Sequence, residues 1–449
     1  MSWGRRSRIR TSLRGQLWVV PALCIVGALV LAEITPILDR ATARFFDGRV
    51  DVDSVRSGLS ATASGMLAFT GFVFAITLLQ VQFGSSALSP RIPRLLRRDG
   101  LTKAALGTFT ATFVYSLETL VEVGADQSNF VPGVSWCCSI VLLLGSLVAF
   151  LLLLQRSADR YRVGGVLQAV SVAGQVAIDE VHPCAADPDR DERAGPRGPV
   201  SKGNPTRVLR HLGRPATLAA FDFDGAVKLA EQQDATLWLV PNLGDFLVEG
   251  SPFLLVQGGT AQLDRRMRRA ATFGDEPMID QDPSFALRLL VDIAVKSISS
   301  AHDPTSATQV LDRLEDLLGR LGARSLGSGQ VADSSGVIRL YYSMPTWTDY
   351  LELALEEIRL YGSGAPQVLR RMRALLDDLH RRVLPFRRPA VEGQLARLDQ
   401  TVEQSFPSAA ERMVASVPDR QGLGSGTRAP AVASVIGERP VRDHRRTRE

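Results

Sequence analysis

The sequence has few cysteines, few lysines and no recognisable catalytic motif, and each shortage excludes a class of protein. Four cysteines among 449 residues are too few for a disulfide-stabilised scaffold. The 38 glycines and 24 prolines follow no collagen-like period, and 45% hydrophobic residues are too many for a disordered chain. A mean hydropathy of +0.05 with 22% charged residues indicates that apolar and charged segments are separated along the chain. The length has room for about two to four domains.

Arginine carries almost all of the positive charge. The chain has 52 basic and 47 acidic residues, which give a formal net charge of +5. An arginine bias of this kind is typical of genome composition, whereas nucleic-acid recognition would add a basic and aromatic stripe or a known motif. The sequence has neither, so we expect no nucleic-acid partner. The only lysines are Lys103, Lys202, Lys228 and Lys296.

The motifs of common enzymes and metal sites are missing. There is no phosphate-binding glycine loop, dinucleotide fingerprint, G-x-S-x-G elbow, H-E-x-x-H helix or paired C-x-x-C. The adjacent Cys137 and Cys138 cannot form a zinc site by themselves, and the five histidines are scattered without ligand spacing. We therefore expect no cofactor and no metal, and the sequence favours a non-enzymatic protein.

Long uncharged stretches predict membrane spans. Residues 16–32, 57–90 and 127–155 contain no charged side chain. A bilayer core of about 30 Å needs roughly 20 apolar residues in a helix, which each stretch supplies or nearly supplies. A fourth candidate is shorter, and two glutamates follow near its end. We predict four transmembrane helices, over residues 16–38, 59–83, 103–123 and 134–155.

The arginine-rich loops predict the orientation of these spans. Basic residues cluster in residues 5–14, 91–103 and 156–162, whereas the loops after the first and third spans have no such excess. Four spans place all three clusters on one side, and basic loops favour the cytoplasmic side. We therefore expect a multi-pass protein of the inner (plasma) membrane, in contact with the lipid bilayer, with both termini in the cytoplasm. The alternative is a cleaved signal peptide ending near Ala32.

Polar side chains recur along one stripe of the third predicted span. Polar groups that face lipid are costly, so the stripe should face the bundle interior, water or the headgroups. One hypothesis is that the stripe lines an ion or solute path in a homo-oligomer. The other is that the hydroxyls bond within their own helix while both acids lie at the outer interface. The stripe is Thr108, Thr112, Tyr115, Thr119 and Glu122, with Glu118 beside it.

The remaining residues divide into shorter segments. Residues 163–182 predict an amphipathic connecting helix, and residues 183–205, rich in proline, glycine and charge, predict a flexible linker. Short apolar runs with Gly-Asp and Glu-Gly turns predict a small β-barrel-like domain over residues 206–262. Its turn pattern is similar to that of barrel-sandwich carrier domains, but Lys228 is not in a carrier motif. The segment is therefore interpreted as a structural or binding barrel.

The last part of the chain has helical periodicity. Residues 263–405 predict a helical cytosolic domain, and residues 406–449 a disordered tail. The fold class we expect is thus a four-helix membrane protein with a cytosolic α+β part. One loop carries candidate chemistry: His302 and Asp303 could form an acid–base pair or bind a cation. Alternatively, Asp303 caps a helix that begins at Pro304.

Three stretches together resemble a bacterial family of predicted multi-span membrane proteins that is classified as a domain of unknown function. The resemblance implies a multi-span N-terminal part and a cytosolic remainder, and it brings no established activity. Members usually have asparagine before the Asp-Pro pair, where this chain has His302. The stretches are Leu88-Ser89-Pro90-Arg91 with Leu106-Gly107-x-Phe109 and Phe113-x-Tyr115, then PNLGDFLVEGSP (241–252), then QDPSFALRLLVDIAVKSISSAHDPTSA (281–307).

Three functional hypotheses follow. The first is a membrane-anchored sensor or adaptor whose cytosolic domains bind a protein partner or a small ligand. The second is an oligomeric conduit lined by the stripe of the third span. The third is a membrane-bound enzyme that uses His302.

Overall fold

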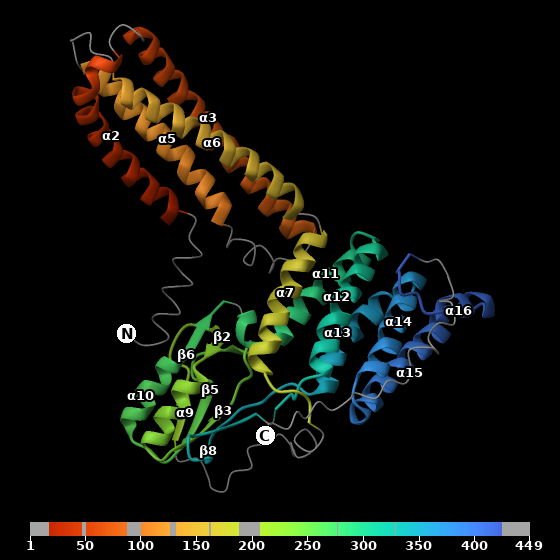
Figure 1. The fold of residues 1–449 in the computed structure, drawn as a ribbon. Coiled ribbons are helices and arrows are strands. Elements are labelled where there is room, and N and C mark those ends of the chain that lie inside the picture. Colours follow the sequence, from red (N-terminus) through yellow and green to blue (C-terminus); the bar gives the residue numbers. More distant parts are fainter. Residues whose placement is uncertain are drawn as a thin grey trace, which may run out of the picture.

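The chain forms a bundle of long apolar helices, a unit of strands and short helices, and a unit of packed helices (Figure 1). We call the last two the α/β unit and the helical unit. The computed structural model describes residues 18–46, 51–87, 100–125, 132–160, 163–187, 207–275, 277–327 and 329–423. The predicted linker beyond residue 187, the basic residues at 5–14 and 91–98, and residues 88–91 of the resemblance lie outside the described residues.

The bundle confirms the prediction of four apolar helices. They are α2 (Val19–Phe46), α3 (Val52–Ala87), α5 (Gly100–Ala125) and α6 (Gly133–Arg160), and each is long and apolar enough to cross a membrane. Helix α5 packs against the other three. Gly107 makes one close approach possible, because a Cβ there would lie 2.8 Å from Cys24 Sγ on α2. Many large apolar side chains point outward from the bundle, as expected for a lipid-facing surface.

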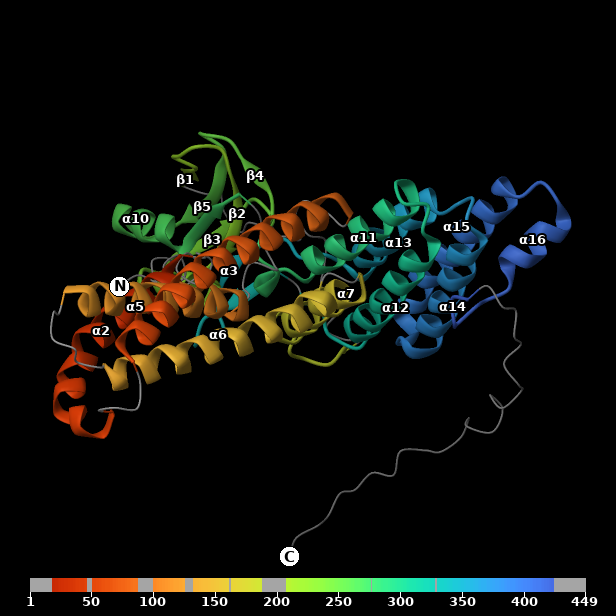
Figure 2. The same cartoon turned by 90° about the horizontal axis from the view of Figure 1, so that it is seen from above.

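Helix α7 (Val163–Val181) follows α6 and belongs to the helical unit. It covers the segment expected to be amphipathic, and its apolar face, which includes Val166, Val170 and Ile178, is buried in the core of that unit. Helices α11 and α12 pack against α7. In two views the α/β unit and helices α14–α16 lie on opposite sides of α7 (Figures 1 and 2).

The small β-barrel-like domain predicted over residues 206–262 is not confirmed, because the described strands form no closed sheet. The strands form two open sheets. The apolar core is covered by two helices, α9 (Phe223–Gln232) and α10 (Ala261–Ala270), with side chains such as Leu263 and Met267, and so it needs no closed barrel. The five-stranded sheet has the order β1 (Arg207–Arg210), β5 (Pro252–Gln257), β3 (Thr236–Leu239), β8 (Ile338–Tyr341), β7 (Gln330–Ala332), and the three-stranded sheet has the order β4 (Phe246–Leu247), β2 (Ala216–Phe221), β6 (Ala271–Gly274).

Three strands, β6, β7 and β8, come from the segment that the sequence assigned to the helical domain. Strand β8 runs parallel to β3, with Leu237 opposite Leu340, and β7 pairs antiparallel with β8. The α/β unit is therefore completed by residues that follow α12 in the chain. Within the described ranges the chain passes between this unit and the helical unit three times, after β6, after α12 and after β8.

The helical unit has one large apolar core. Its helices are η1 (Ile279–Gln281), α11 (Pro283–Ser299), α12 (Pro304–Gly322), α13 (Trp347–Tyr361), α14 (Pro366–Arg382), η2 (Pro385–Arg387), α15 (Arg388–Ser405) and α16 (Ala409–Ser416). Proline begins α11, α12 and α14, where its missing N–H costs no hydrogen bond.

The described part of the C-terminal segment differs from the expected disordered tail. Helix α16 packs against α14 and α15. The following turn is fixed to α14, because Arg370 Nε donates to the carbonyl of Val417 at 3.0 Å and Asp419 N donates to the carbonyl of Arg370. The sequence there has too few apolar residues to show a periodic pattern, so the backbone contacts could not be foreseen. Residues 424–449 lie outside the described residues.

Candidate functional site: a cleft between the α/β unit and the helical unit

A cleft of about 1370 Å³ lies between the two units. One wall is formed by the end of β2, the start of α9 and the loop between β3 and β4. The other wall is formed by residues 275–285, the last turn of α7, residues 342–345 and the start of α13. The cleft is thus assembled from segments that are distant in the sequence, and no sequence pattern predicts it.

The loop between β3 and β4 places polar groups at the rim. Gly244 has φ +94°, a left-handed conformation that glycine adopts without strain, and its N–H donates to the carbonyl of Leu218 at 2.9 Å. The Asp245 carboxylate closes the turn by accepting from Asn242 N at 2.8 Å. A Cβ at position 244 would lie 3.3 Å from Pro277 Cγ in the opposite wall. The glycine therefore lets the two walls approach closely.

Three helices begin at the cleft with capped N-termini. Asp222 accepts from Gly225 N at the start of α9, and Asp282 accepts from Ser284 N at the start of α11. At the start of α13, Thr346 and Asp349 form a reciprocal capping box. A carboxylate beside a helix N-terminus is stabilised by the helix dipole. These acids therefore have a structural role as well as a position in the cleft.

Acidic side chains dominate the charge of the lining. Among the described lining residues Arg288 is the one basic side chain, and it already pairs with Asp292 (2.6 Å) and with Glu357. The cleft therefore disfavours phosphate and other anions. Among the described residues, no group of three or more histidine, cysteine or acidic side chains could hold a metal ion. The acids of the lining are Glu180, Asp222, Asp224, Asp245, Asp275, Asp282 and Asp349.

A hydrogen bond connects the cleft to α7. Tyr350, which is fully buried at the start of α13, has its hydroxyl 3.2 Å from His182 Nε2 at the end of α7. Burial raises the pKa of Tyr350, and the nearby Asp282 carboxylate raises it further, so the phenol stays protonated. Burial also raises the pKa of Asp282 above its usual 3.8, while hydrogen bonds from Ser284 oppose the shift.

Gln281 connects the two walls directly. Phe221 N donates to Gln281 Oε1 at 3.0 Å, and Gln281 Nε2 donates to the carbonyl of Phe221 at 3.1 Å. Among the described strands, β4 pairs with the start of β2 at Ala216 and Thr217 and does not reach Phe221, so this edge of Phe221 has no described strand partner. The side chain amide of Gln281 takes the place of a neighbouring strand.

The inward part of the predicted membrane stripe is held by hydrogen bonds between helices. Thr112 Oγ1 lies 2.8 Å from Ser146 Oγ on α6, and Tyr115 OH donates to Thr35 Oγ1 on α2 at 3.0 Å and to the carbonyl of Ser135. Thr108 Oγ1 donates to its own helix. These groups have partners within the bundle, as expected for polar contacts between membrane helices.

Glu118 and Glu122 lie apart from these groups. Both are exposed, whereas Thr112 and Tyr115 are buried, so the structure does not bring the acids and the hydroxyls together. A different carboxylate, just beyond the predicted first span of residues 16–38, is buried. Asp39, near the end of α2, accepts from Val134 N at 2.6 Å and from Ser135, and so caps α6.

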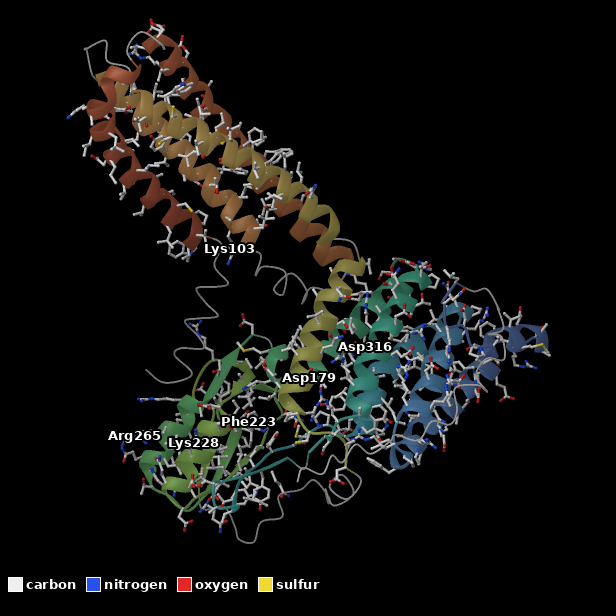
Figure 3. The ribbon with its side chains drawn as sticks, in the orientation of Figure 1. Lys103, Asp179, Phe223, Lys228, Arg265 and Asp316 are labelled. Carbon is white, nitrogen blue, oxygen red and sulfur yellow. The ribbon has the colours of Figure 1, made fainter. Side chains whose placement is uncertain are left out.

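The loop with His302 and Asp303 does not reach the cleft. Asp303 caps α12, because its carboxylate accepts from Thr305 N (3.0 Å) and Ser306 N (3.1 Å). His302 is exposed with φ +51°. Asparagine and histidine are enriched in this left-handed region, which gives a backbone reason for asparagine there in the family pattern. Lys228 is exposed on α9, away from any turn (Figure 3).

Two of the stretches that carry the family resemblance meet in the cleft. Residues 241–246 of the PNLGDFLVEGSP stretch line one wall, and residues 281–285 of the third stretch line the other. Their resemblance to the family was therefore the one sequence signal that could have marked the site. It could not show that the two stretches face each other.

Comparisons with known proteins agree with the architecture. The chain is similar to "Uncharacterized protein Rv1290c" of Mycobacterium tuberculosis (strain H37Rv) and to "Uncharacterized protein Mb1321c" of Mycobacterium bovis. Each is 27% identical over 447 residues, which cover 96% of this chain and 84% of the relative. No solved structure matches the chain significantly. The family described as "Predicted membrane protein (DUF2254)" matches residues 14–378, a range that includes both walls of the cleft. Because this match covers most of the chain, the protein belongs to the DUF2254 family of predicted membrane proteins.

Proposed function

We propose that the protein is a membrane-anchored sensor or adaptor that binds a ligand in the cleft between the α/β unit and the helical unit. The observation that carries this proposal is the cleft itself. Its walls contain two of the three resemblance stretches, and α7 connects it to the membrane bundle. Ligand sites are commonly found between domains. The four apolar helices supply the anchor.

The lining indicates the chemistry of the ligand. Small-molecule pockets usually measure about 300–1,000 Å³, so a cleft of about 1370 Å³ suits a large ligand or an extended segment of a partner protein. The rings of Phe223 and Tyr342 lie 4.7 Å apart, and the lining that contains them also contains seven carboxylates. Aromatic faces and carboxylates both attract cations. We therefore infer a neutral or cationic ligand.

A sensor also needs a route from the cleft to the membrane. Helix α7 follows α6 directly in the chain, and its last residue precedes His182, which contacts Tyr350 beside Asp282. A ligand that moves the start of α13 would therefore act on the end of α7. The basic residues around the spans favour a cytoplasmic position for both units, with the bundle in the inner membrane.

Native mass spectrometry of the full chain in detergent tests the proposal. We expect a small molecule or peptide to remain bound to the wild-type protein. Ser343→Trp places a large side chain at an exposed position of the lining and should abolish this adduct, whereas Ser300→Trp, an equally exposed position outside the lining, should keep it. An adduct retained by both variants, or none in the wild-type protein purified from its own host, contradicts binding in the cleft.

The second candidate function is an oligomeric conduit. Its supporting observation is that Glu118 and Glu122 are exposed on the surface of the bundle, so two copies could bring them together. Ion flux into vesicles that contain the wild-type protein and the double variant Glu118→Gln/Glu122→Gln tests it. A conduit predicts flux that the variant changes, and zero flux from both proteins eliminates this function.

A further inference from the structure

We propose that a surface of the α/β unit, formed by the exposed side of α10 and the loop between β1 and β2, binds anionic lipid headgroups of the membrane that holds the bundle. This proposal does not depend on the cleft or its ligand. We call the surface the arginine surface. It contains Arg210, Arg214, Arg265, Arg266, Arg268 and Arg269, with Leu212 and Val248 at its rim.

Backbone and side-chain contacts make these residues one continuous surface. Helix α10 lies along β1, because Arg207 Nε pairs with Asp264 at 3.1 Å and the Arg268 guanidinium donates to the carbonyl of Arg210. The turn after β4 lies against the loop between β1 and β2, since Gly250 N donates to the carbonyl of His211 at 2.9 Å. The arginines of α10 and of the loop are therefore neighbours.

Most of this positive charge is not neutralised within the described structure. Arg214, Arg265, Arg266 and Arg269 are exposed, and none of them has an ion pair with a described residue. Asp264, on the same helix, is already paired with Arg207. By contrast, many arginines of the helical unit pair with carboxylates, and Arg371, which pairs with Asp312 and Glu315, is an example. The arginine surface is thus available to an anionic partner.

The rim supplies apolar side chains that suit a headgroup layer. Leu212 is 70% exposed at the tip of the loop, and Val248 is 53% exposed in the adjoining turn. Arginines together with exposed aliphatic side chains are typical of surfaces that bind membrane interfaces. A nucleic acid would use the charge, but it would leave Leu212 and Val248 in water.

The bundle keeps a membrane within reach of this surface. Figure 1 shows the α/β unit on the side of α7 that faces the ends of α2 and α5, and Figure 3 shows Arg265 pointing away from α7 and the helical unit. Because the chain is tethered to the bilayer, even weak binding to lipid would be intramolecular and hence effective. Tethering and charge complementarity together favour an anionic lipid surface over a soluble polyanion.

Hydrogen exchange of the full chain in lipid nanodiscs tests this proposal. We compare discs of phosphatidylcholine with discs of phosphatidylcholine and phosphatidylglycerol in equal parts, and follow residues 208–215 and 261–270. We expect exchange of both segments to slow at least about threefold in the anionic discs, and the effect to disappear at high salt, which screens exposed charges. Residues 283–299, in the core of the helical unit, should exchange equally in both discs.

Charge variants distinguish a local site from a general charge effect. Arg265→Gln/Arg266→Gln/Arg269→Gln should weaken docking about a hundredfold and so remove the protection, because each arginine near an anionic surface contributes a similar, additive amount. The matched control, Arg381→Gln/Arg382→Gln/Arg420→Gln, removes the same charge from exposed positions of the helical unit and should keep it. A cooperative thermal unfolding transition in each variant verifies that both variants fold.

Three outcomes overturn the proposal. They are equal exchange in both discs, slowing that survives in the Arg265→Gln/Arg266→Gln/Arg269→Gln variant, and slowing produced by a single-stranded RNA but not by phosphatidylglycerol. The adduct experiment with Ser343→Trp measures ligand binding in the cleft and does not affect these three hydrogen-exchange outcomes. A failure of the ligand site can therefore be distinguished from a failure of the arginine surface.

Discussion

At the scale of single residues, backbone conformation rather than side-chain chemistry explains His302. Its φ of +51° lies in a region that favours asparagine and excludes β-branched residues. We predict that His302→Asn leaves the free energy of unfolding within about 0.5 kcal/mol, whereas His302→Val lowers it by about 1–2 kcal/mol. Thermal unfolding of both variants in detergent measures this. Equal stability of the two variants would contradict the backbone explanation and would favour a role for the imidazole side chain.

Asp282 gives a prediction about pH. Because burial raises its pKa above 3.8 in the folded protein, the folded state holds this proton more tightly than the unfolded state does. Stability from this group is therefore present below the unfolded pKa and is lost as the pH rises through the folded pKa. Asp282→Asn keeps a good N-cap for α11 but does not ionise.

The wild-type protein should therefore lose stability relative to Asp282→Asn as the pH rises from about 4, while the two proteins differ little below it. Unfolding midpoints across the acid range, with Asp303→Asn as a control cap outside the cleft, measure the difference. If Asp282→Asn were less stable than the wild type at neutral pH, the prediction would be contradicted, because the ionised carboxylate would then stabilise the folded protein.

At the scale of elements, the buried Asp39 carboxylate fixes the start of α6. It accepts from two backbone N–H groups and a hydroxyl, so Asp39→Ala leaves those donors without partners and should cost about 1–3 kcal/mol. Asp53→Ala, at the exposed start of α3, should cost less than about 0.5 kcal/mol. Unfolding in the same detergent compares them. Equal costs would mean that the cap does not hold the two helices together.

Helices could be predicted where their information is local. The apolar length of each span and the prolines that begin α11, α12 and α14 are visible in the sequence, and the structure has helices there. Strand pairing is not local. Leu237 pairs with Leu340 across α12, and the sheet is completed by a segment that sequence periodicity placed among helices. For the same reason the sequence could not show that α9 and α10 close the core and leave the sheets open.

At the scale of the whole molecule, the candidate site depends on contacts between segments that are far apart. Thr217 and Tyr350 line the same cleft, and no spacing rule relates them. The sequence indicated candidate residues one at a time. Asp303 could be predicted as a cap because an N-cap contacts only its own helix, and Asp303 does cap α12. The cleft instead requires two units held at a fixed distance, and a few side chains such as Gln281 maintain that distance.

Gln281 therefore tests whether the two units act together. Gln281→Ala removes both hydrogen bonds to the Phe221 backbone and leaves its N–H and carbonyl without partners in a partly buried position, at a cost of about 1–3 kcal/mol. Hydrogen exchange in residues 216–221 should accelerate, and the adduct seen by native mass spectrometry should weaken because the walls separate.

An ionised glutamate at position 281 can still accept from Phe221 N but can no longer donate to the Phe221 carbonyl. We therefore expect the stability of Gln281→Glu to lie between that of the wild type and that of Gln281→Ala, and to rise as acid protonates the carboxyl. Gln262→Ala, at an exposed position of α10, is the control and should change neither readout. If Gln281→Ala accelerated exchange in β2 while the adduct stayed fully bound, the ligand would be held by one wall alone. The cleft would then be a boundary between independent units, and the route through Tyr350 and His182 to α7 would serve only a ligand held by the wall of the helical unit.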